Sequence, residues 1–204
     1  MDIDPRGRTP NQNYKLITGL IVPRPIAWVT TLNMDDTVNL APFSAFNLVT
    51  HKPPMVMLSI GTREGQQKDT SANILSRREF VINIASFEFV EPVHASSANL
   101  PYGESESARL DFRTSASRLL ETPRLSDVAA ALECKLRDCI SYEDADSSVF
   151  IGDVLNFYVR DGLMRDDKVD VKKLNPLARI GGPNYVALGE LRTLPSAELL
   201  LSSR

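Results

Sequence analysis

The segment Pro23-Arg24-Pro25-Ile26-Ala27-Trp28-Val29-Thr30-Thr31 indicates the fold class of this chain. β-branched and aromatic residues fill positions 25–32, and this composition predicts a strand. The two prolines stiffen its start and restrict the conformations of Arg24. Successive strand residues face opposite ways, so we expect one of Thr30 and Thr31 to point inward and the other outward. A strand with a core tryptophan is the plain alternative to a ligand-binding role for this segment.

The next segment, Asn39-Leu40-Ala41-Pro42-Phe43-Ser44-Ala45-Phe46-Asn47, alternates imperfectly between apolar and polar residues. Pro42 cannot donate a hydrogen bond to a neighbouring strand, so this strand is expected to be interrupted or to lie at a sheet edge. An interruption leaves backbone N–H and C=O groups free to face a ligand such as a flavin ring. A simple edge strand fits the local pattern equally well.

Short strand-like segments continue along the chain, whereas helical patterns are few. Strands are predicted over residues 25–32, 38–46, 55–60, 79–85, 130–142, 149–160 and 185–194, with a bulge or bend at Gly152. Helices are predicted over 69–77, 87–99 and 169–174. Many strands, few helices and no βαβ alternation predict a mainly β fold, a closed or half-open antiparallel barrel.

Composition restricts the function classes. The chain has 204 residues, 43% of them hydrophobic, and a formal net charge of −3, which suits one globular domain. We expect a polar lead-in over residues 1–15 and one domain over 16–204. The sequence has no cluster of five Lys or Arg residues, so nothing indicates a nucleic-acid surface. It also has no run of 18 apolar residues, so we predict no membrane span.

Two cysteines, Cys134 and Cys139, occur at an odd spacing. In one extended segment this spacing places them on opposite faces, so we do not expect them to pair. Unpaired cysteines and the lack of a signal-peptide pattern predict a cytoplasmic protein.

Common catalytic motifs are missing from the sequence. It contains no G-x-G-x-x-G, no phosphate-binding G-x-x-x-x-G-K-[ST] and no G-x-S-x-G. His51 and His94 are the only histidines and are far apart in sequence, so we predict no metal site. We expect His94 to be a surface residue, and a solvated face explains the acidic stretch 104–111.

The segment Lys68-Asp69-Thr70-Ser71 combines an ammonium group, a predicted helix start and hydroxyl groups. Free N–H groups at a helix start bind anions, so this segment is a candidate phosphate site. The polar loop 61–67 before it could close over a ligand. The alternative is an ordinary helix cap with a solvated lysine.

The segment 177–185 contains Gly181-Gly182-Pro183, which forces a turn. Arg179 and Tyr185 flank this turn and offer a cation and an aromatic face. A surface turn without function is the alternative.

In this order, these segments resemble the flavin reductase-like, FMN-binding split-barrel family over about residues 14–185. The matching stretches are 21–31, 39–44, 46–47, 53–54, 68–70, Asn73, 79–83, 132–134, 151–154 and 179–185. The sequence departs from the family at 33–37, which lacks the usual turn glycine. It also departs at 102–114, a stretch that lies near the flavin face in the family.

The resemblance implies a six-stranded Greek-key split barrel with peripheral helices, and a homodimer with FMN at the subunit interface. It implies that Lys68 and Thr70 bind the phosphate beside the helix start at Asp69. It implies contacts of Thr30 and Thr31 with the phosphate or the ring edge. The ring would be lined by Asn39, Leu40, Ala41, Pro42, Phe43 and Ser44, with further contacts from Trp28, Asn47, Ser59 and Arg179.

Three functions stay open at this point. The first is an NAD(P)H-dependent flavin reductase that acts through FMN, with NADH or NADPH bound transiently and a monooxygenase as a partner. The second is an FMN-binding electron carrier or sensor without nicotinamide activity. The third is a cofactor-free barrel that binds other proteins. No catalytic side chain is predicted, because the flavin itself carries the redox chemistry.

Overall fold

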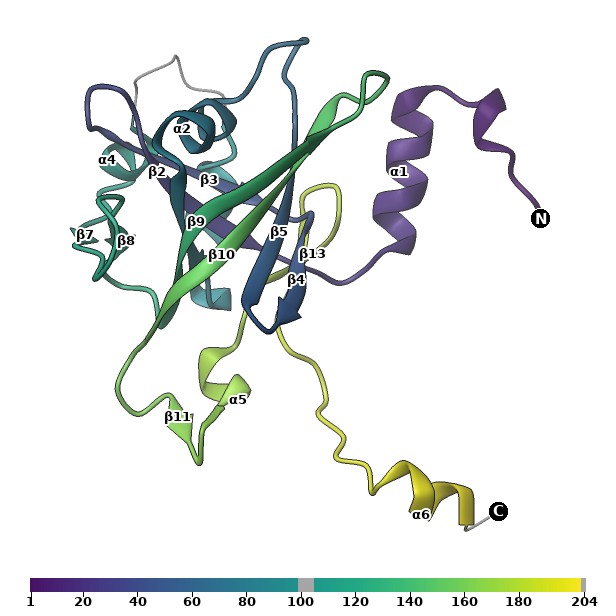
Figure 1. Ribbon diagram of the computed structural model, residues 1–204. Helices are drawn as coiled ribbons and strands as arrows, with labels where there is room; N and C mark the ends of the chain where they lie inside the picture. The colour runs from purple at the N-terminus through teal and green to yellow at the C-terminus, as the bar shows by residue number, and fades with distance from the viewer. Residues whose placement is uncertain (99–104, 203–204) are drawn as a thin grey trace.

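A curved antiparallel sheet forms the centre of the computed structural model, which describes residues 1–98 and 105–202 (Figure 1). Its strands follow the order β3-β2-β6-β9-β10-β5-β4. They are β2 (Ala27–Leu32), β3 (Val38–Phe43), β4 (Phe46–His51), β5 (Pro54–Gly61), β6 (Glu79–Ile84), β9 (Ala130–Ser141) and β10 (Ser147–Val159). The prediction of a mainly β, antiparallel fold is confirmed.

The two outer strands of this order, β3 and β4, are consecutive in the chain. Only Ser44 and Ala45 separate them, and the Ser59 N–H donates to the Ala45 carbonyl at 2.8 Å. The sheet therefore curves until its ends meet at this break. The sheet has seven strands and not the six expected, because the break divides one continuous stretch into β3 and β4. The interruption predicted at Pro42 is found at Ser44, two residues further along the chain.

Shorter strands and helices surround the sheet. The short strands are β1 (Arg24–Pro25), β7 (Thr114–Ser115), β8 (Arg124–Leu125), β11 (Met164–Arg165), β12 (Lys168–Val169), β13 (Ala178–Gly181) and β14 (Asn184–Val186). The helices are η1 (Pro5–Gly7), α1 (Pro10–Leu20), α2 (Asp69–Arg77), η2 (Phe87–Phe89), α3 (Val90–Ala95), α4 (Glu106–Arg109), α5 (Val171–Leu174) and α6 (Ala197–Ser202). None of the described helices is both long and apolar enough to span a membrane.

Some element bounds differ from the predictions. An ordered helix, α1, crosses the boundary of the expected polar lead-in, because Thr9 and Gln12 form a capping box at its start. The last predicted strand, 185–194, is reduced to β14, whose pairing with β13 ends at Val186. The helix predicted over 87–99 divides into η2 and α3, and residue 99 lies outside the described residues.

Both faces of strand β2 are covered, so all six of its residues are buried. Inside the barrel, Val29 packs with Phe80 and Phe150. On the other face, Trp28 belongs to a second buried cluster with Leu125. The expectation that Thr30 and Thr31 point to opposite faces is confirmed, but the outward face is covered as well, so neither threonine is exposed. The segment leading into β8 covers the outer face, and Thr30 Oγ1 donates to the Pro123 carbonyl at 2.7 Å.

The long hairpin of β9 and β10 contains a bulge that corrects another expectation. Leu136 pairs with Gly152 and Asp138 with Ile151, so Arg137 is the extra residue between them. This extra residue reverses the side-chain alternation beyond it. Cys134 is buried in the barrel core and Cys139 packs against the same core, so the two do not lie on opposite faces. Both cysteines are free.

Candidate functional site

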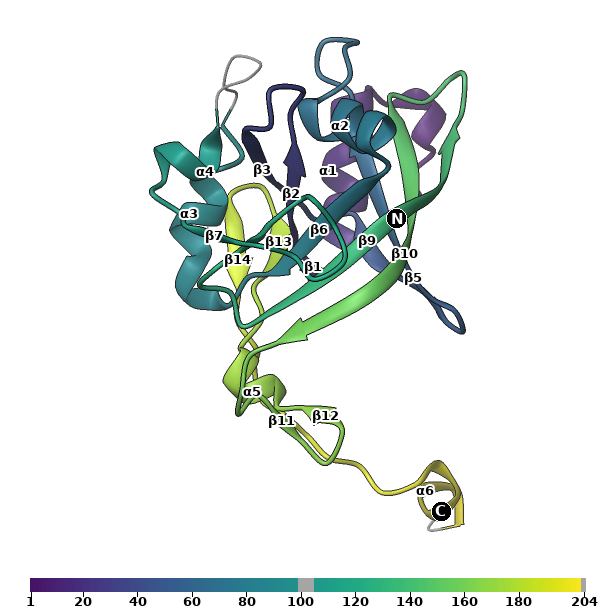
Figure 2. The ribbon, with the colours of Figure 1, turned by 60° about the vertical axis from the view of Figure 1, so that its left-hand side comes forward.

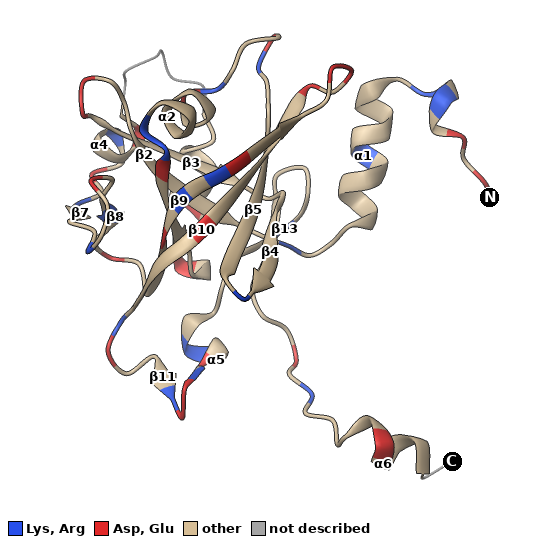
Figure 3. Cartoon of the chain, in the orientation of Figure 1, with Lys and Arg blue, Asp and Glu red and all other residues tan. Residues whose placement is uncertain are grey.

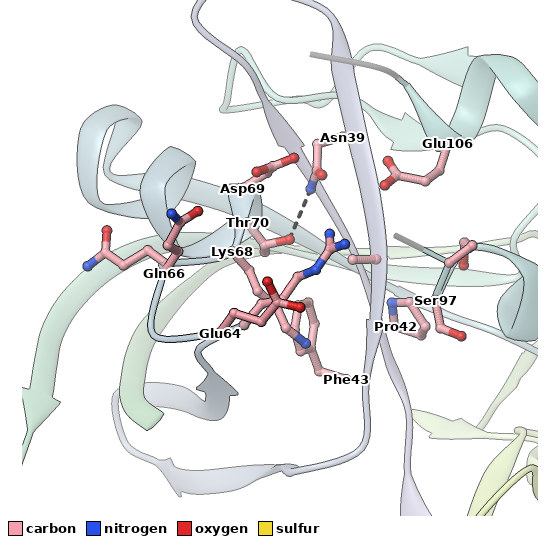
Figure 4. A pocket seen from close by; sticks show the side chains of 15 residues that line it. Asn39, Pro42, Phe43, Glu64, Gln66, Lys68, Asp69, Thr70, Ser97 and Glu106 are labelled. Carbon is pink, nitrogen blue, oxygen red and sulfur yellow. Dashed lines mark hydrogen bonds between the residues drawn. The ribbon is translucent and has the colours of Figure 1, made fainter. Parts of the chain in front are cut away.

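A cavity of about 510 Å³ opens between strand β3, the start of helix α2 and the loop before it (Figure 4). Helices α3 and α4 lie beside β3 on this side of the sheet (Figure 2). The residues that line the cavity are Asn39, Ala41, Pro42, Phe43, Arg63, Glu64, Gln66, Gln67, Lys68, Asp69, Thr70, Ser96, Ser97, Ala98 and Glu106. The cavity volume lies within the usual range for small-molecule sites, roughly 300–1,000 Å³.

Helix α2 presents its N-terminus to this cavity. Its capping position is Lys68, whose side chain makes no capping hydrogen bond. The N–H groups of a first helical turn have no acceptor within the helix, so these groups are available to an anion. The Lys68 ammonium lies 5.7 Å from the centre of the Phe43 ring. Partial burial, together with the like charge of Arg63, lowers the pKa of Lys68.

A buried amide–hydroxyl network fixes Thr70 against the sheet (Figure 4). The Asn39 side-chain amide donates to Thr70 Oγ1 and to Thr31 Oγ1, both at 3.0 Å. The Asn73 amide donates to the same Thr31 oxygen at 3.0 Å and to Asn33 Oδ1 at 2.7 Å. Two strands and one helix are joined through these groups. The position of the α2 N-terminus relative to β3 is therefore set by hydrogen bonds as well as by packing.

Helix α4 places a carboxylate on the opposite wall of the cavity. Glu106 is buried, and its Oε2 accepts a hydrogen bond from the Leu40 N–H at 3.1 Å. The Ser105 and Ser107 hydroxyls both donate to the Val38 carbonyl. Side chains of α4 thus satisfy the outer backbone groups of β3. The solvated face expected for 104–111 is wrong at Glu106, because α4 docks against the free edge of β3.

Burial is the main cause of a pKa shift for two acids at this site. It raises the pKa of Glu106, and the negative charge of Asp69 adds to this increase. Burial also raises the pKa of Asp69, while the nearby positive charge of Arg63 opposes that change. Three acids, Glu64, Asp69 and Glu106, and two cations, Arg63 and Lys68, therefore line one cavity, and its net charge depends on pH.

Replacing Glu106 by glutamine tests this arrangement. A group with a raised folded-state pKa adds stability at acidic pH, and this contribution is lost as the pH rises through the raised pKa. Glu106→Gln keeps an oxygen acceptor for the Leu40 N–H but carries no charge. We expect its melting temperature to exceed that of the parent at about pH 8 and the difference to shrink toward about pH 5.

Thermal unfolding of the ligand-free protein between these pH values measures this effect. Glu106→Ala is the matched control, since it leaves the buried Leu40 N–H without its acceptor and should cost about 1–3 kcal/mol across the range. A Glu106→Gln variant that is equally destabilised at every pH would contradict the charge argument.

The structure brings together seven of the residues predicted for the site: Asn39, Ala41, Pro42, Phe43, Lys68, Asp69 and Thr70. Two other predicted residues do not line the cavity but hydrogen-bond to residues that do. Thr31 accepts from Asn39, and the Trp28 indole N–H donates to Ser96 Oγ at 2.9 Å.

The remaining predicted residues lie away from the cavity lining. Thr30 and Leu40 are buried. Ser44 accepts from Arg24 Nε at 3.4 Å, at the β3–β4 break. Asn47 and Ser59 are on β4 and β5. Arg179, on β13, donates to the Gly182 carbonyl and lies 5.4 Å above the Tyr185 ring.

Several lining residues were not among the predicted ligands. Arg63, Glu64, Gln66 and Gln67 come from the loop that we expected to close over a ligand, but none of them was predicted individually. Ser96, Ser97 and Ala98 follow α3, and no local motif marks them. Glu106 lies in the stretch 102–114 predicted near the flavin face, of which 102–104 are outside the described residues. Among the described residues, no group of three His, Cys, Asp or Glu side chains could hold a metal ion.

Comparison with known proteins gives one family match and several close relatives. The family model for the flavin reductase like domain matches residues 19–177. An uncharacterised protein of Aquifex aeolicus is 36% identical over 182 residues, which is 88% of this chain and 92% of that protein. The uncharacterised protein YwrF of Bacillus subtilis is 34% identical over 187 residues, 89% of this chain and 91% of that protein.

Solved structures give the same picture. Nitrilotriacetate monooxygenase component B from Bacillus cereus is 34% identical, with a TM-score of 0.92 over 95% of this chain and 98% of that one. The 2-nitrobenzoate 2-nitroreductase NbaA of Pseudomonas fluorescens is also 34% identical. Its TM-score is 0.86, and the match covers 97% of this chain and 100% of that one. A Shewanella frigidimarina protein with a split barrel domain is 19% identical, with a TM-score of 0.84. The match covers 97% of this chain and 100% of that one and shows a shared fold.

Proposed function

Because this chain belongs to the flavin reductase-like family, we propose that it binds FMN in the cavity beside α2 and uses it as an NAD(P)H-dependent flavin reductase. The observation that supports this proposal best is the N-terminus of α2, which has no side-chain cap and opens into the cavity next to Lys68. A phosphate group needs such a set of N–H donors and a cation.

The residues of the cavity fit the parts of FMN. Lys68, Arg63 and the first turn of α2 would hold the phosphate, with the Thr70 hydroxyl as a further partner. The wall formed by Ala41, Pro42 and Phe43 offers apolar surface and backbone groups to a flat ring system.

Few side-chain catalysts are needed for this function. When bound, FMN supplies hydride and electron transfer. The chain's own residues bind and orient it. Asn39 holds Thr70 in place, and Gln66 and Gln67 line the cavity from the loop before α2. Glu106 fixes the backbone of β3 through the Leu40 N–H.

The electron donor and the recipient are part of the proposal. We assign NADH or NADPH as a transient donor, since the sequence has no dinucleotide-binding motif that would hold it permanently. The similarity to a monooxygenase component B supports a partner monooxygenase that receives reduced flavin. We assign a homodimer, with FMN at the interface, as the functional unit.

A second candidate function follows from the similarity to a 2-nitrobenzoate 2-nitroreductase at the same level of identity. In that case the reduced flavin would pass its electrons to a nitroaromatic compound and not to a separate protein. Consumption of 2-nitrobenzoate by the FMN-loaded protein with NADH or NADPH would favour this function over flavin supply.

The visible spectrum of the purified protein tests the proposal. We expect absorption bands of bound FMN, and we expect them to bleach when NADH or NADPH is added without oxygen. A yellow protein that does not bleach would be an electron carrier or sensor. A protein that neither retains nor binds added FMN would overturn the proposal.

A further inference from the structure

The C-terminal arm, residues 187–202, leads away from the barrel and ends in helix α6 (Figures 1 and 2). The arm carries Leu191, Leu194, Leu199 and Leu201, which are 48% to 77% exposed. Within the arm, the Leu199 N–H donates to Ser196 Oγ. A helix of six residues is marginal in water without tertiary packing. Both its length and its leucines indicate that the arm packs against another surface.

Helix α1 offers a second apolar surface of the same kind. Tyr14, Ile17 and Ile21 follow the i, i+3, i+7 spacing of one helix face, and Leu20 adjoins them. These four side chains are 56% to 79% exposed, and no residue of α1 is buried. The C-terminal end of α1 is nevertheless anchored, because Arg24 Nη1 donates to the Thr18 and Ile21 carbonyls, each at 2.6 Å. The helix therefore presents a fixed apolar stripe to solvent.

The stripe and the arm are complementary, but they do not meet within one chain. Helices α1 and α6 lie far apart in both views of the molecule (Figures 1 and 2). The charged residue of α1 is Lys15, and that of α6 is Glu198, so the two helices carry opposite charges (Figure 3). A chain with two complementary surfaces that it does not itself bring together can cover both in a two-fold symmetric pair.

We propose that the C-terminal arm of each copy packs against the α1 stripe of a second copy, so that two chains exchange arms. Leu194, Leu199 and Leu201 would cover Tyr14, Ile17 and Ile21 of the other chain, with Glu198 near the other chain's Lys15. The inference rests on the homodimer of the proposed function and adds which segments hold it together. In such a dimer both arms and both α1 stripes are removed from water, which stabilises the assembly.

Sedimentation equilibrium of the FMN-loaded protein tests the arm exchange. A chain ending at Val186 should dissociate into monomers with a dimer dissociation constant at least about 100-fold above that of the full chain. Ile17→Asp should weaken the dimer in the same direction. Leu119→Asp is the matched control, because Leu119 is as exposed as Ile17, at 56%, but lies in neither surface.

Disulfide trapping identifies the partner. Chains carrying Ile17→Cys are mixed with chains carrying Leu201→Cys, each in a Cys139→Ser background, and are then oxidised. We expect a cross-linked mixed dimer, and no cross-link when Leu119→Cys replaces Ile17→Cys.

Three outcomes would overturn the inference. One is a dimer whose dissociation constant is unchanged by removal of the arm, and this leaves the proposed function intact. Another is a disulfide that forms within a single chain carrying both Ile17→Cys and Leu201→Cys. A full-length, FMN-loaded protein that is monomeric at all concentrations would overturn both the arm exchange and the proposed homodimer.

Discussion

Replacing Lys68 by alanine is expected to weaken FMN binding about 10- to 150-fold, which corresponds to roughly 1.5–3 kcal/mol for a lost charge-assisted hydrogen bond. Lys68 caps α2 without using its side chain, so its ammonium group is available to a ligand phosphate. Partial burial lowers its pKa, because the ammonium has lost part of its hydration. A phosphate at this position would restore a favourable environment for the charge.

Titration of FMN fluorescence with the two proteins measures this loss. Lys52→Ala is a suitable control, since Lys52 is an exposed lysine outside the cavity lining. The control should bind FMN as tightly as the parent protein does. Equal FMN affinity of Lys68→Ala and the parent would overturn the assignment of the phosphate to the start of α2.

Replacing Gly152 by alanine is expected to destabilise the barrel by about 1–3 kcal/mol, the usual cost of overpacking a core. A Cβ atom at this position would lie 2.6 Å from Phe80 Cζ and 3.3 Å from Cys134 Cβ. Both neighbours belong to the barrel core and are fully buried, so they have little room to move. The glycine is needed for the close approach of the Phe80 ring to β10.

Thermal unfolding measures this change, and a loss of 1 kcal/mol lowers the melting temperature by roughly 2–4 °C in a chain of this size. Gly61→Ala on the neighbouring strand β5 is the control, because its Cβ would find its nearest neighbour at 3.7 Å. The double variant Gly152→Ala with Phe80→Leu should recover part of the loss. A Gly152→Ala protein as stable as Gly61→Ala would show that the core yields more easily than its packing implies.

Local patterns in the sequence predicted most of the regular structure. The predicted bounds of helix α2, Asp69 and Arg77, are confirmed, although its N-cap is Lys68 and no side chain caps it. Strands β6, β9 and β10 lie within one or two residues of their predicted bounds. Such elements depend on neighbours along the chain, which the sequence displays directly. The same holds for the cavity residues that are contiguous, 39 with 41–43 and 68–70.

Other features depend on contacts between distant segments. Glu106 contacts β3 across 66 positions in sequence, and Trp28 contacts Ser96 across 68. No spacing rule along the chain connects such partners. The bulge at Arg137, which turns Cys139 back toward the core, likewise arises from pairing with β10.

The sequence by itself determined the strands and the bounds of α2, because propensity acts over a few residues, and it predicted a candidate anion site at 68–70. Only the tertiary structure decided which faces are buried and which walls enclose the cavity. Helices α2 and α4 both contact β3, and docking of α4 against β3 buries the Glu106 carboxyl group. Burial and the electrostatics that follow from it are properties of the assembled fold, since each depends on atoms that are remote in the sequence.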